Sequence, residues 1–247
     1  MTARNPSVPV KRPVTAGRNS ARPLGSSEPP ETTTLAARTL GVLRSDILSL
    51  KLAPGSKLLL ARLCETYKVG LSPLREALSR LVVQGLVVGE DHRGFWVTPL
   101  TEEDFYDLTF VRREIESMAV ARSVERGDDR WEAELTRAFT HMSAAVSEQG
   151  KTVATWTQRH EVFHEALVSA CGSPRLIQLR RQLFDQFMRY QRIAPRHVWI
   201  GAARNAEHQQ IMDAAVARDV DACKRLVRAH IKVLDVIVDA VRAHRDK

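Results

Sequence analysis

Hydrophobic positions recur at helical spacing from Thr32 onward. Leu40, Leu43, Ile47 and Leu50 follow one another at intervals of three, four and three residues, which places them on one face of an α-helix. A Pro-Gly pair then predicts a turn, and apolar positions in the run LLLARLCETY predict a second, short helix. The run KVG is the predicted connecting turn after it, so two helices open this part of the chain.

The segment SPLREALSRLVVQG predicts a third helix with a defined start and stop. Ser72 is a good N-cap, Pro73 suits the first helical position, and Gly85 suits the position after the end. Three leucines at helical intervals form its buried stripe. Arg75 and Ser79 lie one turn apart on another face, so we expect them to be available to a partner.

The next run, LVVGEDHRGFWVTP, predicts a β-hairpin, because two β-rich stretches flank the polar segment EDHRG. Three helices followed by a hairpin within about 65 residues are typical of a winged helix-turn-helix. We assign this fold to residues 32–99 and expect the second helix of the turn pair to enter the major groove of DNA. A small helical domain that does not bind DNA is the alternative.

From residue 101 onward the sequence shows only helical patterns. The run TEED supplies a cap and an acidic first turn for a helix that continues to about residue 126. Further helices are expected at roughly 129–148, 155–171, 174–193, 202–218 and 220–244. Residues 100–247 therefore predict an all-α helical bundle of about six helices, and the whole chain is expected to be mainly α.

The positive charge is concentrated in the first two-fifths of the chain. Of the net charge of +8, residues 1–99 carry +7, with 14 Lys or Arg and 7 Asp or Glu. Residues 100–247 are nearly neutral, with 23 basic and 22 acidic residues. A basic module beside a neutral one predicts a polyanion as the partner of the first. Residues 1–31, rich in Pro, Ser, Thr and Arg, are expected to be a disordered basic tail.

Other features of the sequence narrow the expected location. There is no run of about eighteen apolar residues that could span a membrane, and no apolar segment follows the first positive charges as in a secretory signal. Cys64, Cys171 and Cys223 are far apart, odd in number and form no CxxC pair. We therefore expect a protein of the reducing cytoplasm, without a membrane partner.

Four of the eight histidines have spacings that could bring them together. His160 and His164 are four residues apart, so their rings share one face of one helix. His208 and His230 each lie 11 residues from Asp219, near which two consecutive helices meet. In an antiparallel pair of helices they would stand at the same height. Four imidazoles converging in a helical bundle suit a Zn, Ni, Cu or Fe ion, although ordinary helix histidines are the alternative.

The stretch HEVFH offers a second interpretation, because two histidines four apart beside a glutamate form the short signature of a zinc protease helix. Glu161 would then be the general base that activates water. The extended metalloprotease pattern requires a glycine and a third histidine, and this chain has Leu167 and Ala170 at those places. A metal-dependent hydrolase is therefore kept only as the alternative function.

The motifs APGSKL, ETYKVGLSPLREALSRLVVQGLV and HRGFWV resemble the DNA-binding domain of the GntR family. The segments FVRREIE, FHEALVSACGSP, EHQQIMDAAVARD and RAHI resemble the FadR-type effector domain of that family, called FCD, so that the resemblance covers about residues 35–240. The VG-x-x-PLREAL form is similar to that of the carbon-starvation-induced branch. The resemblance implies a bacterial, homodimeric transcription regulator that binds double-stranded operator DNA. We expect it to be a repressor rather than an activator.

The resemblance also implies which residues contact DNA. The family contacts match Ser72 and Arg75 on the third helix and Arg93 and Gly94 at the hairpin. Two departures are present: Leu71 stands where many members have Arg, and Ala61 stands at another common Arg position, with Arg62 one place on. The complete DNA-binding set that we predict is Ser72, Arg75, Ser79, Arg62, Arg93 and Gly94.

Many FCD domains hold a divalent transition metal, Zn or Ni for example, through an Asp and three His. The His positions match His164, His208 and His230, whereas the Asp position is His160 here. The resemblance also implies that Arg112 and the metal together hold the carboxylate of a small organic acid, such as a dicarboxylate. A surface ion pair between Arg112 and Glu116, one helical turn away, is the alternative for this arginine. A DNA-binding architectural protein without an effector remains a third possible function.

Overall fold

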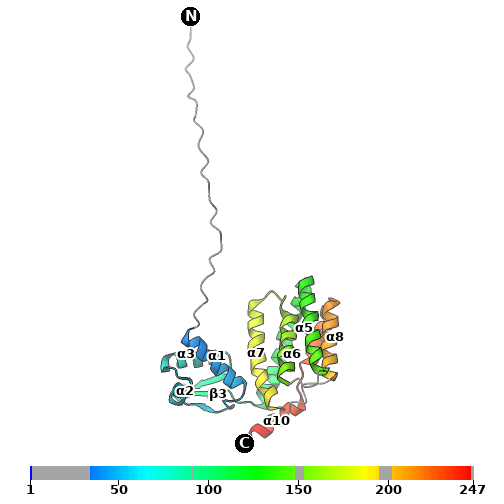
Figure 1. The fold of residues 1–247 in the computed structure, drawn as a ribbon. Helices are drawn as coiled ribbons and strands as arrows, with labels where there is room; N and C mark the ends of the chain where they lie inside the picture. The colour runs from blue at the N-terminus through cyan, green and yellow to red at the C-terminus, as the bar shows by residue number, and fades with distance from the viewer. Residues whose placement is uncertain (2–33, 91, 148–152, 195–201, 246–247) are drawn as a thin grey trace. The chain divides into compact units, whose positions relative to one another are not determined.

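The N-terminal elements are three helices and a small sheet (Figure 1). The structure is a computed structural model that describes residues 1, 34–90, 92–147, 153–194 and 202–245. Its three N-terminal helices correspond to the three that the sequence predicts. The tail predicted for residues 1–31 lies outside the described residues, apart from Met1. The elements are α1 (Leu35–Leu48), β1 (Lys57–Leu58), α2 (Leu60–Tyr67), α3 (Leu71–Val83), β2 (Val87–Glu90) and β3 (Gly94–Val97).

The predicted hairpin is formed by β2 and β3, which pair antiparallel with Glu90 opposite Gly94. The sheet has a further strand that the sequence did not predict, because β1 is only two residues long and shows no alternation. It pairs antiparallel with β3, which gives the order β1-β3-β2. The hairpin is thereby tied to the chain that precedes α2, which supports the wing from one side.

The predicted apolar stripes form the core of these elements. Leu43 and Ile47 of α1 are fully buried, and so are Leu74, Leu78 and Leu81 of α3. Burying a leucine side chain contributes about 1.5–3 kcal/mol, so these contacts fix α3 against α1. The opposite face of α3 is left to solvent.

The start of α3 differs from the prediction. The helix begins at Leu71 with Gly70 as its N-cap, so Ser72 is not the cap. Lys68 ends α2 in a left-handed conformation, and Gly70 is extended, so the chain enters the new helix two residues earlier than Ser72 suggested. Pro73 still lies in the first turn, where its missing N–H removes no helical hydrogen bond.

The C-terminal elements are helices, as predicted. Thr101 caps the first of them by accepting a hydrogen bond from the backbone N–H of Asp104. The described helices are α4 (Glu102–Arg126), α5 (Asp129–Ser147), α6 (Val153–Val168), α7 (Pro174–Ile193), α8 (Ala202–Val216), α9 (Val220–His230) and α10 (Asp235–Arg245).

The helix predicted over residues 220–244 is two helices, α9 and α10. The first ends at His230, and the second begins at Asp235. Neither Gly nor Pro marks this break. The carbonyl oxygen of Ile231 accepts a hydrogen bond from the Arg113 guanidinium of α4, so a tertiary contact replaces a helical one at this point.

α4 is the central helix of this bundle, with α7 and α9 packed against it. Figure 1 shows α5 and α6 side by side, and these two helices also pack closely. Side chains from α4, α5, α6 and α8 form a hydrophobic core that includes Val120, Leu135, Phe163 and Ile211, all of which are fully buried. No described helix is both long and apolar enough to cross a membrane.

α7 also contacts the N-terminal elements. The guanidinium of Arg44 on α1 forms an ion pair with Asp185, and the side-chain amide of Gln186 donates to the carbonyl of Gln84, at 2.9 Å. Arg189 donates to the carbonyl of Thr98. The same helix therefore touches α1, the end of α3 and the segment that leads into α4.

Candidate functional site

The four histidines predicted to converge do lie together. His160 and His164 come from α6, His208 from α8 and His230 from α9. The Nε2 atom of His160 is 3.0 Å from Nε2 of His164 and 3.0 Å from Nε2 of His208. One nitrogen of each ring lies within 4.8 Å of the others. We predicted that His208 and His230 lie at the same level along neighbouring helices, because each is 11 residues from Asp219, the N-cap of α9. The structure confirms this prediction.

These four nitrogens fit a divalent transition metal. A tetrahedral zinc ion with nitrogen ligands at about 2.0–2.1 Å separates those ligands by about 3.3 Å. The observed separations, from 3.0 Å to within 4.8 Å, bracket that value. Imidazole nitrogens are also the ligands that Zn, Ni, Cu and Fe accept. The residues present therefore fit the metal that the sequence predicted.

Two of the rings are oriented by partners on α8. Nδ1 of His208 donates to the backbone carbonyl of Arg204 at 2.7 Å, and Nδ1 of His230 donates to Glu207 Oε2 at 2.9 Å. Such outer hydrogen bonds fix the tautomer of a metal-binding histidine and leave Nε2 with a free lone pair. Neither partner was predicted from the sequence, although Arg204 lies one helical turn before His208.

Burial keeps the cluster uncharged. It holds the pKa of His160 and of His164 well below the ordinary value, and the neighbouring imidazoles lower both further. Burial also lowers the pKa of His208 to about 3. The pKa of His230 is lowered by burial despite the opposing hydrogen bond to Glu207. At neutral pH all four rings are thus neutral, which is the form that binds metal.

A cavity borders the histidines on the side of α4 and α7. It has a volume of about 30 Å³, which is enough for one or two water-sized groups. Three cationic side chains line it, and three aromatic side chains add apolar surface. The lining residues outside the histidine cluster include Arg112, Arg204, Lys232, Trp156, Phe184 and Phe187.

Arg112 faces this cavity and is almost entirely buried, with 6% of its surface exposed. Its guanidinium carbon lies 4.1 Å from the ring centre of Phe187, and its Nη2 is 3.6 Å from Glu116 Oε1. The Nε atom has no hydrogen-bond partner among the described residues, and burial lowers the pKa of Arg112 to about 10. The ion pair considered for Arg112 and Glu116 does form, but both residues are buried, so its expected position on the surface is wrong.

The carboxylates nearest to the site are already shared between cations. Glu207 accepts hydrogen bonds from Arg204 and Lys232 in addition to His230. Glu116 pairs with Arg180 at 2.7 Å as well as with Arg112. The surroundings of the cavity are therefore rich in positive charge, which favours an anionic ligand.

A second hollow lies between α3 and the hairpin. It has a volume of about 540 Å³ and is lined by Arg75 and Ser79 from α3 and by Arg93 and Gly94 from the hairpin. Ser72 and Arg62 are exposed but do not line this hollow. The predicted DNA-binding residues thus divide into four that surround one depression and two that lie elsewhere on the exposed surface.

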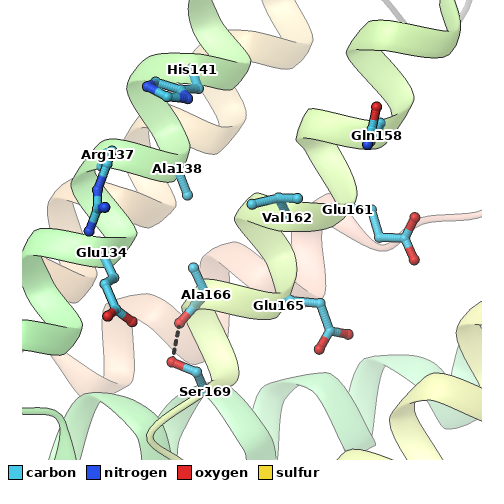
Figure 2. Close-up of a pocket in the computed structure, with 10 residues that line it drawn as sticks. All are labelled: Glu134, Arg137, Ala138, His141, Gln158, Glu161, Val162, Glu165, Ala166 and Ser169. Carbon is cyan, nitrogen blue, oxygen red and sulfur yellow. Dashed lines mark hydrogen bonds between the residues drawn. The ribbon is translucent and has the colours of Figure 1, made fainter.

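Glu161 does not share the cavity of the histidines. It lines a surface groove between α5 and α6, with a volume of about 710 Å³, where Val162 and Arg137 are also found (Figure 2). Figure 2 shows the Glu161 carboxylate pointing away from α5. The groove is larger than the inner cavity, but its charged side chains are partly or fully exposed and do not converge on one point. Glu161 is thus not placed as a general base beside the histidines.

Comparison with known proteins agrees with the two parts of the structure. The FCD domain family matches residues 107–233, and the gntR family of bacterial regulatory proteins matches residues 35–97. The HTH-type transcriptional repressor GlaR of Escherichia coli is 34% identical over 76% of this chain and 89% of its own length. The HTH-type transcriptional regulator BphR of Paraburkholderia xenovorans is 36% identical over 80% and 82%.

Solved structures show the same fold. The E. coli McbR/YncC structure has a TM-score of 0.66 and 20% identity, covering 80% of this chain and 93% of its own. A GntR transcriptional regulator from Rhodococcus has a TM-score of 0.64 and 23% identity, covering 84% and 98%. GlaR and BphR are named as transcriptional regulators, so the hydrolase alternative is not supported. The chain is a DNA-binding transcriptional regulator, not an enzyme, and it belongs to the GntR family, in the group that carries an FCD domain.

Proposed function

We propose that this regulator is a metabolite-responsive repressor that binds a palindromic operator as a homodimer and changes its DNA affinity when a small organic acid binds at a metal-containing pocket. The observation that carries the proposal is the position of the four histidines beside the buried, incompletely paired Arg112. The name of one relative, a repressor, supports the direction of control. We place the protein in the bacterial cytoplasm, where operator DNA is found.

The DNA-binding half of the proposal rests on α3 and the hairpin. Arg75 and Ser79 are exposed on α3. As the second helix of the helix-turn-helix pair, α3 would be the recognition helix that enters the major groove. Arg93 and Gly94 of the hairpin would contact the flanking sugar-phosphate backbone of the DNA. Arg62 and Ser72 would add contacts near the start of the recognition helix, and phosphate contacts would make binding sensitive to salt.

The sensing half rests on the cavity. His160, His164, His208 and His230 would hold a divalent transition metal, with zinc favoured and nickel possible, and the metal would supply a positive centre for an anion. Arg112 would bind the carboxylate of the acid through its guanidinium. A dicarboxylate fits the proposal best, because Arg204 and Lys232 also line the cavity. Since the cavity holds only about 30 Å³, a whole acid requires movement of side chains at its entrance.

The segment between the two halves would carry the response. Residues 97–104 comprise the end of β3, the connecting segment and the start of α4. α7 contacts this segment through Arg189 and lines the cavity through Phe187. A ligand changes DNA affinity only if it prefers one arrangement of the reading heads over another. We propose that the bound acid favours the arrangement that does not fit the operator.

Two measurements test this function. Small dicarboxylates are screened for release of a labelled DNA fragment from upstream of the gene, and release by at least one acid is expected. The double variant with His208→Ala and His230→Ala is expected to lose bound metal in elemental analysis, whereas His141→Ala, an exposed histidine on α5, retains it. Stoichiometric metal in the double variant would remove these residues from the proposed site. An architectural protein would bind DNA with no change on adding any acid.

A further inference from the structure

We propose that the metal and the anionic ligand bind to this chain as a mutually dependent pair, each strengthening the other at least about tenfold, because every candidate metal ligand is a neutral imidazole. This inference rests on the proposed function, since it concerns the same metal and anion. It goes beyond the proposed function because it states how binding of the metal and binding of the anion depend on each other.

The first step is the charge of the ligand set. Among the described residues, the group that could hold a metal consists of four histidines and contains no carboxylate. A divalent ion bound by four neutral nitrogens keeps its full charge of about +2. His208 is fully buried and His230 is 7% exposed, so this charge would lie where water screens it poorly. Burying an uncompensated charge is costly, which weakens metal binding in the absence of an anion.

The second step is that nearby carboxylates are not free to compensate. Glu207, the carboxylate next to His230, is held by Arg204 at 2.8 Å and Lys232 at 3.0 Å. It contacts the distal nitrogen of the His230 ring and is therefore an outer partner. Glu116 is held by Arg180 and Arg112. Among the described residues, neither of these two carboxylates is thus available to the metal, and we infer that a bound anion supplies the negative charge.

The third step is that the cavity contains a buried cation that could bind the anion. Arg112 is buried and has an Nε atom without a partner among the described residues, and the cavity that it lines also borders His160, His164 and His230. Without the metal, an anion in this cavity would meet only the side-chain cations of Arg112, Arg204 and Lys232. The metal would add a further positive centre, so the metal and the anion each lower the cost of burying the other.

Thermodynamic linkage makes this dependence measurable from both sides. If an anion tightens metal binding by some factor, the metal tightens anion binding by the same factor. Co²⁺ is a suitable probe, because its visible absorption reports the ligands around it and succinate binds it weakly in water. The dissociation constant of Co²⁺ is measured on the full-length protein with and without saturating succinate, in buffer without other carboxylates or phosphate. That of succinate is measured with and without Co²⁺.

We expect both constants to fall by the same factor, at least about tenfold, and the cobalt spectrum to change when succinate is added. Acetate serves as a second probe with a single carboxylate. If Co²⁺ binds with the same affinity with and without either acid, the inference is wrong, although the metal site of the proposed function stands. If Co²⁺ does not bind at all, the proposed metal site itself fails.

One substitution tests the origin of the coupling. His160→Asp places a carboxylate in the ligand set, so Co²⁺ should bind more tightly without an acid and the enhancement by succinate should shrink at least threefold. His141→Asp adds the same charge on the exposed surface of α5 and should leave both values unchanged. Equal enhancement in His160→Asp and wild type would contradict the role of the neutral ligand set. The wild-type measurement decides the main claim even if the variant does not fold.

Discussion

The indole ring of Trp156 stacks on the imidazole of His160, with ring centres 4.6 Å apart and planes inclined by 18°. The two residues are one helical turn apart on α6, and Trp156 is 3% exposed. The stack forms one wall of the cavity and restricts the rotation of the His160 ring. His160 is thus held in position before any metal binds, which reduces the entropy cost of binding.

This stack predicts a fluorescence signal for metal binding. Cu²⁺ or Ni²⁺ bound to His160 should quench the emission of Trp156, because the metal would lie within a few ångströms of the indole. Titration of the metal into wild-type protein should show saturable quenching, and Trp156→Phe should lose most of it. Trp131, which packs in the bundle core, provides the matched control as Trp131→Phe. Equal quenching in the Trp156→Phe protein would place the metal elsewhere.

The exposed face of α3 predicts a specific loss of DNA binding. Arg75→Ala should weaken operator binding by about 1–3 kcal/mol and relax the preference at one base pair, if the guanidinium contacts a base edge. Arg137→Ala removes an arginine that is also exposed, on α5, and should have no effect. Mobility-shift titrations with the operator and with single-base variants measure both quantities. An equal loss of affinity for the operator and for every single-base variant would instead indicate that Arg75 contacts a phosphate.

A buried carboxylate in the N-terminal part predicts a pH dependence of stability. Asp46 accepts hydrogen bonds from the Tyr67 hydroxyl at 2.5 Å and from Lys51 at 3.0 Å. Burial alone would raise the pKa of Asp46, but these two partners outweigh it and hold the pKa below 3.8. Because the folded-state pKa is the lower one, the stabilisation is fully present above about pH 4 and is lost as the pH falls through the folded value.

Asp46→Asn should therefore lower the free energy of unfolding by about 1–3 kcal/mol at pH 7. The difference between variant and wild type should shrink as the pH is lowered from 5 to 3. Urea unfolding of both proteins across this range measures the effect, with Tyr67→Phe as a second test of the same hydrogen bond. A difference that stays constant with pH would show that the ionised carboxylate is not the stabilising group.

The sequence predicted the features of the site that depend on regular helix geometry. His160 and His164 share a face because they are four residues apart, and His208 and His230 stand level because each is 11 residues from Asp219. The same arithmetic could have found Trp156, one turn before His160. The role of Glu207 could not be predicted, because it depends on the packing of α8 against α9, which joins it to His230 and Lys232.

Features that depend on distant contacts were missed for the same reason. The break after His230 follows from a hydrogen bond between Arg113 and Ile231, which are 118 residues apart in the chain. β1 exists only because Lys57 and Leu58 pair with β3, and two residues carry no recognisable strand pattern. Local signals therefore located the helices and most site residues, whereas tertiary contacts determined their ends and the outer partners of the histidines.

The link between cavity and DNA-binding elements predicts a variant that separates binding from response. Tyr190 of α7 is buried, and its hydroxyl donates to the Asp104 carboxylate at 2.5 Å. The same oxygen accepts a hydrogen bond from the backbone N–H of Thr101 at 3.3 Å. Burial and the bond to Asp104 raise the pKa of Tyr190, so the hydroxyl stays protonated. It thereby ties the start of α4 to a helix whose Phe184 and Phe187 line the cavity.

Tyr190→Phe removes this tie without changing the shape of the ring. We expect the free energy of unfolding to fall by about 1–3 kcal/mol, since a hydrogen bond to a charged group is lost. Operator affinity without an acid should stay within about threefold of wild type, while release of DNA by the acid should require more acid or become incomplete. Tyr106→Phe makes the same chemical change at a half-exposed position on α4 and should alter neither property. If Tyr190→Phe responds to the acid as wild type does, the cavity acts on the DNA-binding elements by another route.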